Sequence, residues 1–569
     1  MNSETKNCQN CKKDFVIESE DFDFYKKMKV PAPTFCPKCR LVRRLAARNE
    51  RVLYKNNCDL CKKEVVTTFS KDSPHITYCA SCWWGDEWDP ISYGQEYDFS
   101  KPFFEQLYEL KKRVPFQVAR FRNSINCSYS NGAVYCKNCV SIYSGIQSVN
   151  CYYCQSPLFS KDSIDSDVLL NAERAYQTVS CNGVYNTKFV YFSDECISSS
   201  FLFNCIGCSD CIGCVNLRNK KYCIFNKQYS KEDYKKEIKK WDLSSYKKTK
   251  EVEEKFWELY YKTPRRFAII NKAVNVSGDS IKNAKNCKNC FVVLDGIENC
   301  KNLFLCALLL KDSHDITLAG DNSSLNYYSM GNTEAHNVKF TDGSNNVINV
   351  EYCEQIYSGK NLFGCVGLRN KKYCILNKQY TKEKYEELIP KIKQHMNKMP
   401  YVSETGIVYK YGEYIPIEHG LWSYNETLAQ QWFPLSKKEV LEKGYKWKEK
   451  EDKNYKIDIK SKDIPDNIED VTDDILDKVI ECEGGYDQVC TKAFKILPDE
   501  LKLYRAMKVA LPRKCPNCRF YKRLSIRNKP ELYHRKCMKK GCDNEFETPI
   551  SKDRKEIVYC KDCYQKEFI

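Results

Sequence analysis

The chain has 569 residues, 92 Lys and Arg against 75 Asp and Glu, a net charge of +17, and 35 cysteines. Its length allows roughly three to five domains, and no run approaches the roughly 18 apolar residues of a membrane-spanning helix, so no membrane partner is expected. The positive charge favours acidic partners, nucleic acid first, although excess lysine can equally be an ordinary solvated surface.

The 35 cysteines raise the question of whether the protein is secreted or cytoplasmic. The amino terminus, Met1 to Lys6, lacks a hydrophobic signal region, so we expect a cytoplasmic protein rather than a secreted disulfide framework. In a reducing compartment, cysteines bind metal or stay reduced. Metal sites are therefore the first hypothesis.

Residues 1–84 form a tandem cysteine module with four pairs in order. Two cysteines separated by two residues in a tight turn can direct both thiolates at one ion, and two such pairs complete a tetrahedral zinc shell. A shell of four sulfurs leaves no position for a reactive water, so we expect structural zinc. The predicted ligands are Cys8, Cys11, Cys36, Cys39, Cys58, Cys61, Cys79 and Cys82.

The first module resembles a known family. Its Cys8-x2-Cys11-x3-Phe15, Phe24-Tyr25, Pro33 and Cys36-Pro37-x-Cys39-Arg40, followed by Arg43-Arg44, are similar to the zinc-ribbon or treble-clef domain of many uncharacterised bacterial proteins. The whole chain also resembles long cysteine-rich proteins of candidate-phylum bacteria, which carry such zinc units around a repetitive middle. The resemblance implies zinc binding and brings no known activity.

A basic helix is predicted from Arg40 to Asn49, with arginines on one face at every fourth position. A guanidinium group can give phosphate two hydrogen bonds at once, which makes these arginines and their repeats candidate nucleic-acid contacts. The alternative is that they pair with acidic residues of their own module, for instance Glu20, Asp21 and Asp23. The six candidates are Arg40, Arg44, Arg48, Arg519, Arg523 and Arg527.

Between the cysteine modules we expect a mainly β architecture with helices. Asn-Cys recurs here, beginning with Asn126-Cys127; Asn tolerates the left-handed conformation and Cys is a small buried hydrophobe, a pairing that suits the rungs of a parallel β-solenoid. Two longer sequence echoes suggest rungs of about 21 residues. The predicted segments are a connector with a helix (85–125), a first β-solenoid segment (126–229), a helical insertion (230–265), a second β-solenoid segment (266–380), a helix (381–398), an aromatic segment (399–457) and an acidic linker (458–480).

The densest sulfur run is Cys205-x2-Cys208-x2-Cys211-x2-Cys214. It could hold zinc or a [4Fe–4S] cluster, but the bacterial ferredoxin run ends with a three-residue gap and Cys-Pro, which this stretch lacks. Cysteines that line solenoid rungs are therefore favoured.

Residues 481–569 repeat the tandem cysteine module. In this copy Asp487 stands in register with Cys8; Cys482 is the nearest replacement, and Asp487 is a possible oxygen ligand. Neither His75 nor His534 has a histidine at the matching position, so neither is expected to bind metal. The predicted ligands are Cys482, Cys490, Cys515, Cys518, Cys537, Cys542, Cys560 and Cys563. About four structural zinc ions follow, and an Fe–S cofactor is not expected.

These features predict a central parallel β-solenoid flanked by duplicated zinc modules, in a non-enzymatic protein that binds nucleic acid or ribonucleoprotein bivalently. The alternative is a protein-interaction scaffold built on the solenoid. A third hypothesis, a solenoid enzyme acting on a glycan, would need clustered carboxylates, and the sequence offers no pair of fixed geometry. The acidic residues considered are Asp295, Asp312, Asp315, Asp321 and Asp342.

Overall fold

The computed structural model describes residues 2–450, 454–486 and 488–568. The chain divides into two compact units, each of which joins segments far apart in sequence. Unit 1 consists of Met1–Ala119, Ala268–Glu449 and Lys529–Leu532; unit 2 consists of Arg120–Phe267, Lys450–Asn528 and Tyr533–Ile569. The N-terminal cysteine module therefore belongs with the second β segment, and most of the C-terminal module with the first.

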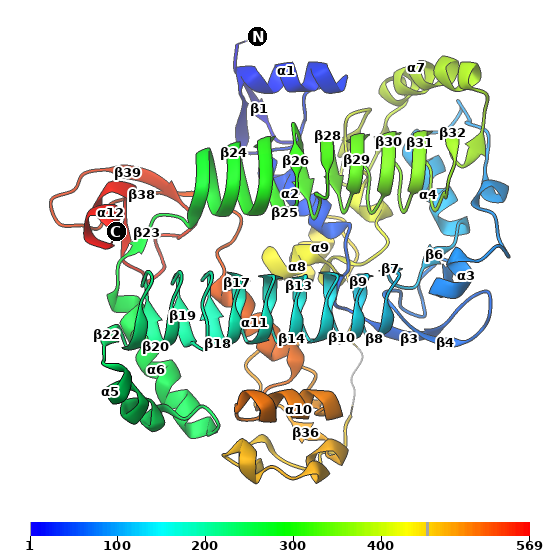
Figure 1. Cartoon of the computed structure of the whole chain (residues 1–569). Helices are drawn as coiled ribbons and strands as arrows, with labels where there is room; N and C mark the ends of the chain where they lie inside the picture. The colour runs from blue at the N-terminus through cyan, green and yellow to red at the C-terminus, as the bar shows by residue number, and fades with distance from the viewer. Residues whose placement is uncertain (1, 451–453, 487, 569) are drawn as a thin grey trace. The chain divides into compact units, whose positions relative to one another are not determined.

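Unit 2 contains a curled parallel sheet that runs from β7 (Phe121–Arg122) to β22 (Lys227–Gln228) (Figure 1). Alternate strands pair in two rows; Lys137 of one strand pairs with Val149, and Tyr143 with Gln155. The paired residues are 12 positions apart, so the chain completes one coil every 12 residues and the expected 21-residue rung is wrong. The strands between these ends are β8 (Ile125–Ser128), β9 (Asn131–Val134), β10 (Lys137–Val140), β11 (Tyr143–Ile146), β12 (Val149–Tyr152), β13 (Gln155–Leu158), β14 (Lys161–Ile164), β15 (Asp167–Leu170), β16 (Glu173–Tyr176), β17 (Val179–Asn182), β18 (Tyr185–Tyr191), β19 (Ser200–Phe203), β20 (Ser209–Val215) and β21 (Lys221–Ile224).

Unit 1 contains the second curled parallel sheet, from β24 (Ile270–Lys301) to β33 (Lys378–Gln379). Its first coil has links of 11 and 12 residues, the next coils are 13 residues long, as in the pairing of Phe291 with Phe304, and its later coils return to 12. The intervening strands are β25 (Phe304–Ala307), β26 (Leu310–Lys311), β27 (His314–Thr317), β28 (Ser323–Met330), β29 (Thr333–Lys339), β30 (Asn345–Glu351), β31 (Tyr357–Phe363) and β32 (Lys372–Ile375).

A three-residue repeat produces these small coils. Along both sheets nearly every third residue has a positive φ, and the residue that follows it points inward. The asparagines of the Asn-Cys pairs occupy the left-handed positions, as the sequence predicted: Asn126, Asn138, Asn150, Asn204, Asn286, Asn289 and Asn299 all have φ between 51° and 55°. Because the coils are narrow, the interior is filled mostly by Cys, Ser, Ala and Val, with some Leu and Ile.

The asparagines also form ladders between coils. The side-chain amide of Asn126 donates to Asn138 Oδ1 (3.2 Å), that of Asn138 to Asn150 Oδ1 (3.4 Å), and that of Asn150 to Asp162 Oδ1 (2.8 Å). Each Asn therefore serves twice, once by its tolerance of the left-handed conformation and once as a link to the next coil.

Replacing Asn138 separates the two roles. Asn138→Ala should cost about 1–2 kcal/mol for the left-handed backbone and about 1 kcal/mol for each of the two lost ladder bonds. Asn138→Gly loses both ladder bonds but keeps backbone freedom, so it should be less destabilising. Urea unfolding of unit 2 measures both; an alanine variant as stable as the glycine variant would contradict this explanation.

The interior cysteines act as small hydrogen-bonding hydrophobes. Cys205, Cys208, Cys211 and Cys214 are the four inward residues of a single coil and are all buried. The thiol of Cys214 donates to Ile212 O (3.3 Å) and that of Cys211 to Ser209 O (3.2 Å). This placement is the one expected of cysteines that line the coils.

Helices extend from the sheets and the cysteine modules. Ser230 and Thr381 cap α5 and α7 through their side-chain oxygens, and Ser245 caps α6 in the same way. Within the described residues no helix is both long and apolar enough to cross a bilayer. The helices are α1 (Ser19–Met28), α2 (Pro37–Ala46), α3 (Ala80–Trp84), α4 (Phe103–Arg113), α5 (Lys231–Glu237), α6 (Tyr246–Lys262), α7 (Lys382–Lys398), α8 (Leu428–Trp432), α9 (Lys437–Glu442), α10 (Pro498–Met507), α11 (Pro516–Ile526) and α12 (Lys561–Phe568).

Candidate metal centres

Sixteen cysteines gather into four groups of four, two in each unit. Within every group the four sulfur atoms lie within 4.8 Å of one another. The groups are Cys8, Cys11, Cys36 and Cys39; Cys58, Cys61, Cys79 and Cys82; Cys482, Cys490, Cys515 and Cys518; and Cys537, Cys542, Cys560 and Cys563. All sixteen predicted ligands are therefore placed in sets that could each hold one metal ion.

Every group is built in the same way. The first two cysteines lie in the loop of a short antiparallel hairpin, and the last two begin a helix: Cys36 precedes α2, Cys79 precedes α3, Cys515 precedes α11 and Cys560 precedes α12. The hairpins are β1 (Glu4–Asn7) with β2 (Asp14–Ile17), β3 (Tyr54–Asn57) with β4 (Glu64–Thr67), β36 (Ile480–Glu481) with β37 (Ala493–Phe494), and β38 (Tyr533–Lys536) with β39 (Glu545–Thr548).

A backbone N–H to sulfur hydrogen bond recurs in all four groups. The N–H of the third cysteine donates to the sulfur of the first, at 3.1 to 3.3 Å. Side-chain amides add to two of the groups, where Asn10 donates to Cys39 (3.3 Å) and Asn544 to Cys560 (3.6 Å). Such bonds stabilise negative charge on sulfur and hold the ligands in position.

The sulfur spacing fits a tetrahedral ion. Cys11 and Cys36 have sulfurs 3.8 Å apart, as do Cys61 and Cys79, and the sulfurs of Cys542 and Cys560 are 3.9 Å apart. Zinc bound at about 2.3 Å by four thiolates separates them by about 3.8 Å, whereas a disulfide needs about 2.05 Å. The donor set and the spacing both suit zinc.

Hydrogen bonds between the cysteines of a group also shift the pKa values of their thiols. Hydrogen bonds with the Cys36 and Cys39 side chains hold the pKa of Cys8 well below its usual range, and one with Cys482 lowers the pKa of Cys515 to about 4. The thiolate is the form of cysteine that binds metal.

In the third group Cys482 takes the place that Cys8 has in the first. Each follows the first strand of its hairpin, and the loop between Cys482 and Cys490 is longer than the one between Cys8 and Cys11. The alternative ligand Asp487 lies outside the described residues. Neither histidine belongs to a group: His75 Nδ1 contacts Lys111 O at 3.2 Å, and His534 Nε2 contacts Glu545 at 2.8 Å.

The six candidate arginines are buried, with 0 to 7% of each exposed. In unit 1, Arg40 Nη2 lies 3.0 Å from one oxygen of Asp315 and Arg44 Nη1 lies 3.3 Å from the other. Arg44 Nε also donates to Thr317 Oγ1 at 3.0 Å. Helix α2 of the cysteine module is thus clamped to strand β27 of the curled sheet.

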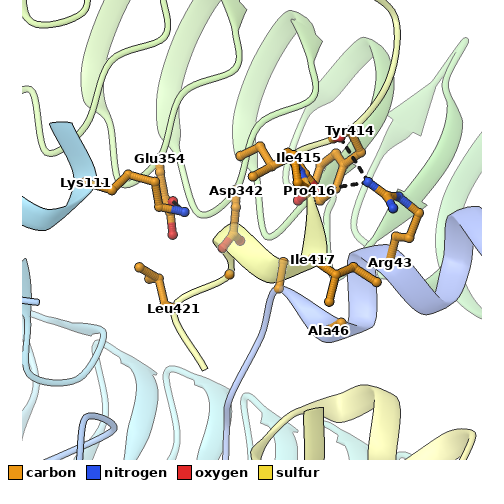
Figure 2. Close-up of a pocket in the computed structure, with 12 residues that line it drawn as sticks. Arg43, Ala46, Lys111, Asp342, Glu354, Tyr414, Ile415, Pro416, Ile417 and Leu421 are labelled. Atoms are coloured by element: carbon orange, nitrogen blue, oxygen red, sulfur yellow. Dashed lines mark hydrogen bonds and ion pairs between the residues drawn. The ribbon is translucent and has the colours of Figure 1, made fainter. Parts of the chain in front are cut away.

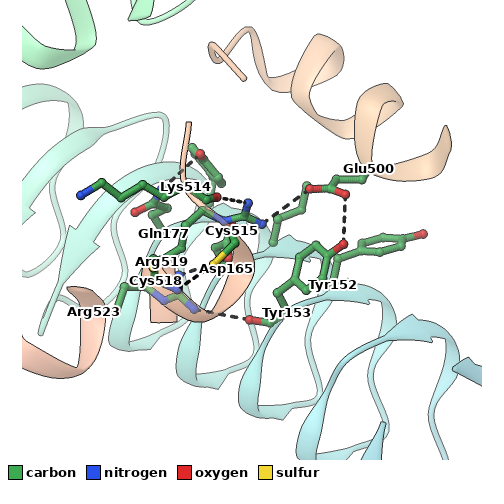
Figure 3. A network of polar contacts seen from close by, with 12 residues as sticks. Tyr152, Tyr153, Asp165, Gln177, Glu500, Lys514, Cys515, Cys518, Arg519 and Arg523 are labelled. Carbon is green, nitrogen blue, oxygen red and sulfur yellow. Dashed lines mark hydrogen bonds and ion pairs between the residues drawn. The ribbon is translucent and has the colours of Figure 1, made fainter. Parts of the chain in front are cut away.

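Unit 2 repeats this clamp (Figure 3). Arg519 Nε lies 2.7 Å from Asp165 Oδ2, and Arg523 contacts Asp165 at 3.2 Å and Asp167 at 3.0 Å. All of these side chains are almost completely buried. The duplicated module therefore binds a duplicated aspartate on each curled sheet.

This burial argues against the predicted phosphate contacts. Arg48 lies 3.3 Å from Glu50 of its own module. Two of the three acidic residues named as alternative partners are engaged elsewhere: Asp21 pairs with Lys301 at 2.8 Å, and Glu20 pairs with Lys288. The alternative interpretation expected the arginines to pair with acidic residues of their own module. Arg40 and Arg44 do pair with a carboxylate, but it is that of Asp315 on the curled sheet.

The aspartates of the clamp were not identified as arginine partners from the sequence, although a signal exists. Lys161-Asp162-Ser163-Ile164-Asp165 and Lys311-Asp312-Ser313-His314-Asp315 share the pattern Lys-Asp-Ser-x-Asp. The first Asp of each pattern joins an asparagine ladder on the outside, and the second binds the arginines. Asp315, one of the carboxylates considered for glycan hydrolysis, is therefore occupied by Arg40 and Arg44.

Comparisons with known proteins add little. No family model matches the chain, and no curated protein matches it. One solved structure, described as "putative acetyltransferase from Desulfovibrio desulfuricans G20", aligns with 12% identity over 49% of this chain and 83% of its own. Its TM-score of 0.10 is too low to support any argument about fold or activity.

Proposed function

We propose that the protein is a zinc-stabilised protein-interaction scaffold. In this proposal the two curled sheets are β-solenoids, and each carries a tandem module of the zinc-ribbon or treble-clef type with two structural zinc ions. Two features support the zinc modules: the four-sulfur shells, and the arrangement of hairpin loop followed by helix.

The buried contacts of Arg40 and Arg44 with Asp315, and of Arg519 and Arg523 with Asp165, form what we call the arginine clamp. This clamp is the observation that favours a scaffold over a nucleic-acid binder. A module that offered its arginines to phosphate would leave them exposed at the surface. Here the same side chains join the module to the sheet, which makes module and sheet one rigid body within each unit. A rigid, repetitive body suits the display of binding surfaces to other proteins.

Nucleic-acid binding remains a second candidate because the net charge is +17. It would then depend on exposed lysines instead of the six arginines. Such binding should be weak, sequence-independent and steeply dependent on salt.

One capture experiment separates the two candidates. Immobilised protein is incubated with lysate at physiological salt, with and without nuclease treatment. The scaffold proposal predicts defined protein partners that survive nuclease and nucleic-acid retention that disappears at this salt. Retention of nucleic acid alone, with no nuclease-resistant protein, would contradict it.

A further inference from the structure

Each unit contains a cysteine module bound to a curled sheet, and the residues of one unit can be matched with those of the other. Counting from Cys36 and Cys515, Arg40 and Arg44 correspond to Arg519 and Arg523. By the same count Thr34, Phe35 and Arg43 correspond to Arg513, Lys514 and Lys522. On the sheets, Tyr328 corresponds to Gln177 one coil beyond the clamp aspartates, and Phe340 corresponds to Phe189 two coils beyond; all four have a left-handed conformation.

In unit 1 a stretch of the chain's own aromatic segment, Tyr409–Ile415, lies in the groove between these residues. Both the N–H (3.1 Å) and the hydroxyl of Thr34 donate to the buried carboxylate of Glu413. Arg43 donates to Tyr409 Oη (3.0 Å) and to the carbonyl oxygens of Tyr414 and Ile415 (Figure 2).

The aromatic rings of this stretch pack on the curled sheet. Tyr414 stacks on Tyr328 with ring centres 5.0 Å apart, and Tyr411 lies 6.2 Å from Phe340. The N–H of Gly412 donates to Tyr352 Oη at 2.9 Å. The N–H of Glu413 also donates to Lys410 O at 3.2 Å, and Gly412 has a positive φ, so the groove of unit 1 accommodates a tight turn that presents one carboxylate between aromatic side chains.

In unit 2 the corresponding place is a pocket that is open to solvent and has a cavity volume of about 70 Å³. A cavity of this size has room for a few water molecules or for a carboxylate group. Gln177 and Phe189 from the sheet line it, as do Arg513, Lys514 and Lys522 from the cysteine module, and helix α6 provides the opposite wall. Figure 3 shows Gln177, Lys514 and Arg519 near one another at this site.

Charge in the pocket favours an anionic group. Lys250 and Lys522 share the single carboxylate of Glu253, and Arg519 is held by Asp165. Glu483 also lines the pocket, where basic side chains outnumber the acidic ones. Arg513 is 6% exposed; its Nη2 donates to two backbone carbonyls, and its Nη1 is buried with no hydrogen-bond partner among the described residues. A buried donor without a partner is unfavourable, and an incoming carboxylate would supply the missing acceptor.

We propose that this pocket binds a turn of a partner protein that presents a glutamate or aspartate beside an aromatic side chain. The carboxylate takes the place of Glu413, facing Arg513 and Lys514 where unit 1 has Thr34 and Phe35. The neighbouring ring packs on Phe189, as Tyr411 packs on Phe340. The proposal rests on the scaffold function and specifies the chemistry of its partner.

A peptide copied from the chain supplies the probe. A fluorescein-labelled peptide with the sequence of residues 408–416, Val-Tyr-Lys-Tyr-Gly-Glu-Tyr-Ile-Pro, is titrated into the full-length zinc-loaded protein and followed by fluorescence anisotropy. We expect one peptide per chain, because the unit 1 groove is already filled. The same peptide with Gln in place of Glu413 should bind at least about tenfold more weakly.

Protein variants locate the site. Lys514→Glu should weaken binding at least about tenfold, and Lys236→Glu, an exposed change on α5 of the same unit, should leave it unchanged. Absence of binding, or binding indifferent to both Lys514→Glu and the peptide substitution, would overturn the proposal. If proteins are still captured from lysate in that case, only the assignment of this pocket fails and the scaffold function stands.

Discussion

Loss of one proposed zinc ligand from the N-terminal cysteine module is expected to unfold that module. Cys39→Ser should remove most of the zinc-binding free energy of its site, which is on the order of 10 kcal/mol in small zinc peptides. The effect should be large because Cys39 lies in the first turn of α2, the helix whose Arg40 and Arg44 hold the curled sheet. Limited proteolysis and metal content report the loss.

A buried cysteine outside the groups provides the matched control. Cys353 lies in the interior of the sheet in the same unit, and its thiol donates to Glu351 O at 3.2 Å. A serine can make the same hydrogen bond, so Cys353→Ser should cost only about 1–2 kcal/mol and release no metal. Equal effects of the two substitutions would show that Cys39 is merely a core residue.

Removal of the charge on Asp315 is expected to cost about 3–5 kcal/mol, because two buried guanidinium groups would lose their only carboxylate in the described contacts. Burial alone would raise the pKa of Asp315, but Arg40 and Arg44 outweigh it and the pKa is lowered. The carboxylate therefore stabilises the fold at neutral pH, and that contribution is lost as the pH falls below about 3.8 and through the lowered folded-state pKa. Asp315→Asn, followed by urea unfolding, measures it.

Asp312→Asn is the control for that experiment. Asp312 also has a left-handed backbone, which Asn tolerates, but its side chain is partly exposed and pairs only loosely with Lys27, at 3.6 Å. We expect a change within about 0.5 kcal/mol. If Asp315→Asn changed the free energy of unfolding equally little, the contacts of Arg40 and Arg44 with Asp315 would contribute little to the attachment of the cysteine module to the sheet.

The parts of the fold that depend on local chemistry could be predicted from the sequence. Cysteine spacing and the duplication of the module identified the sixteen ligands, but not which pairs share one group. Asn-Cys identified left-handed positions followed by buried ones. The coil length could not be derived in this way. The sequence echoes compared different sides of coils that are 12 residues long in one place and 13 in another.

The role of the arginines could not be predicted because it depends on a contact between distant segments. Arg44 and Asp315 are 271 positions apart, and nothing in the spacing of the arginines distinguishes a phosphate site from a buried clamp. The repeated Lys-Asp-Ser-x-Asp pattern is visible in the sequence, but its meaning depends on which side of the coil each aspartate faces. The open pocket of unit 2 likewise emerges only when the two units are compared in space.

The central claim is that sixteen cysteines hold four zinc ions, one for each four-sulfur group. Native mass spectrometry of anaerobically purified protein, combined with X-ray absorption at the zinc edge, tests it most directly. The account predicts four zinc ions per chain, each with four sulfur neighbours at about 2.3 Å. A zinc-free folded protein, or zinc bound mainly through oxygen and nitrogen, would contradict it.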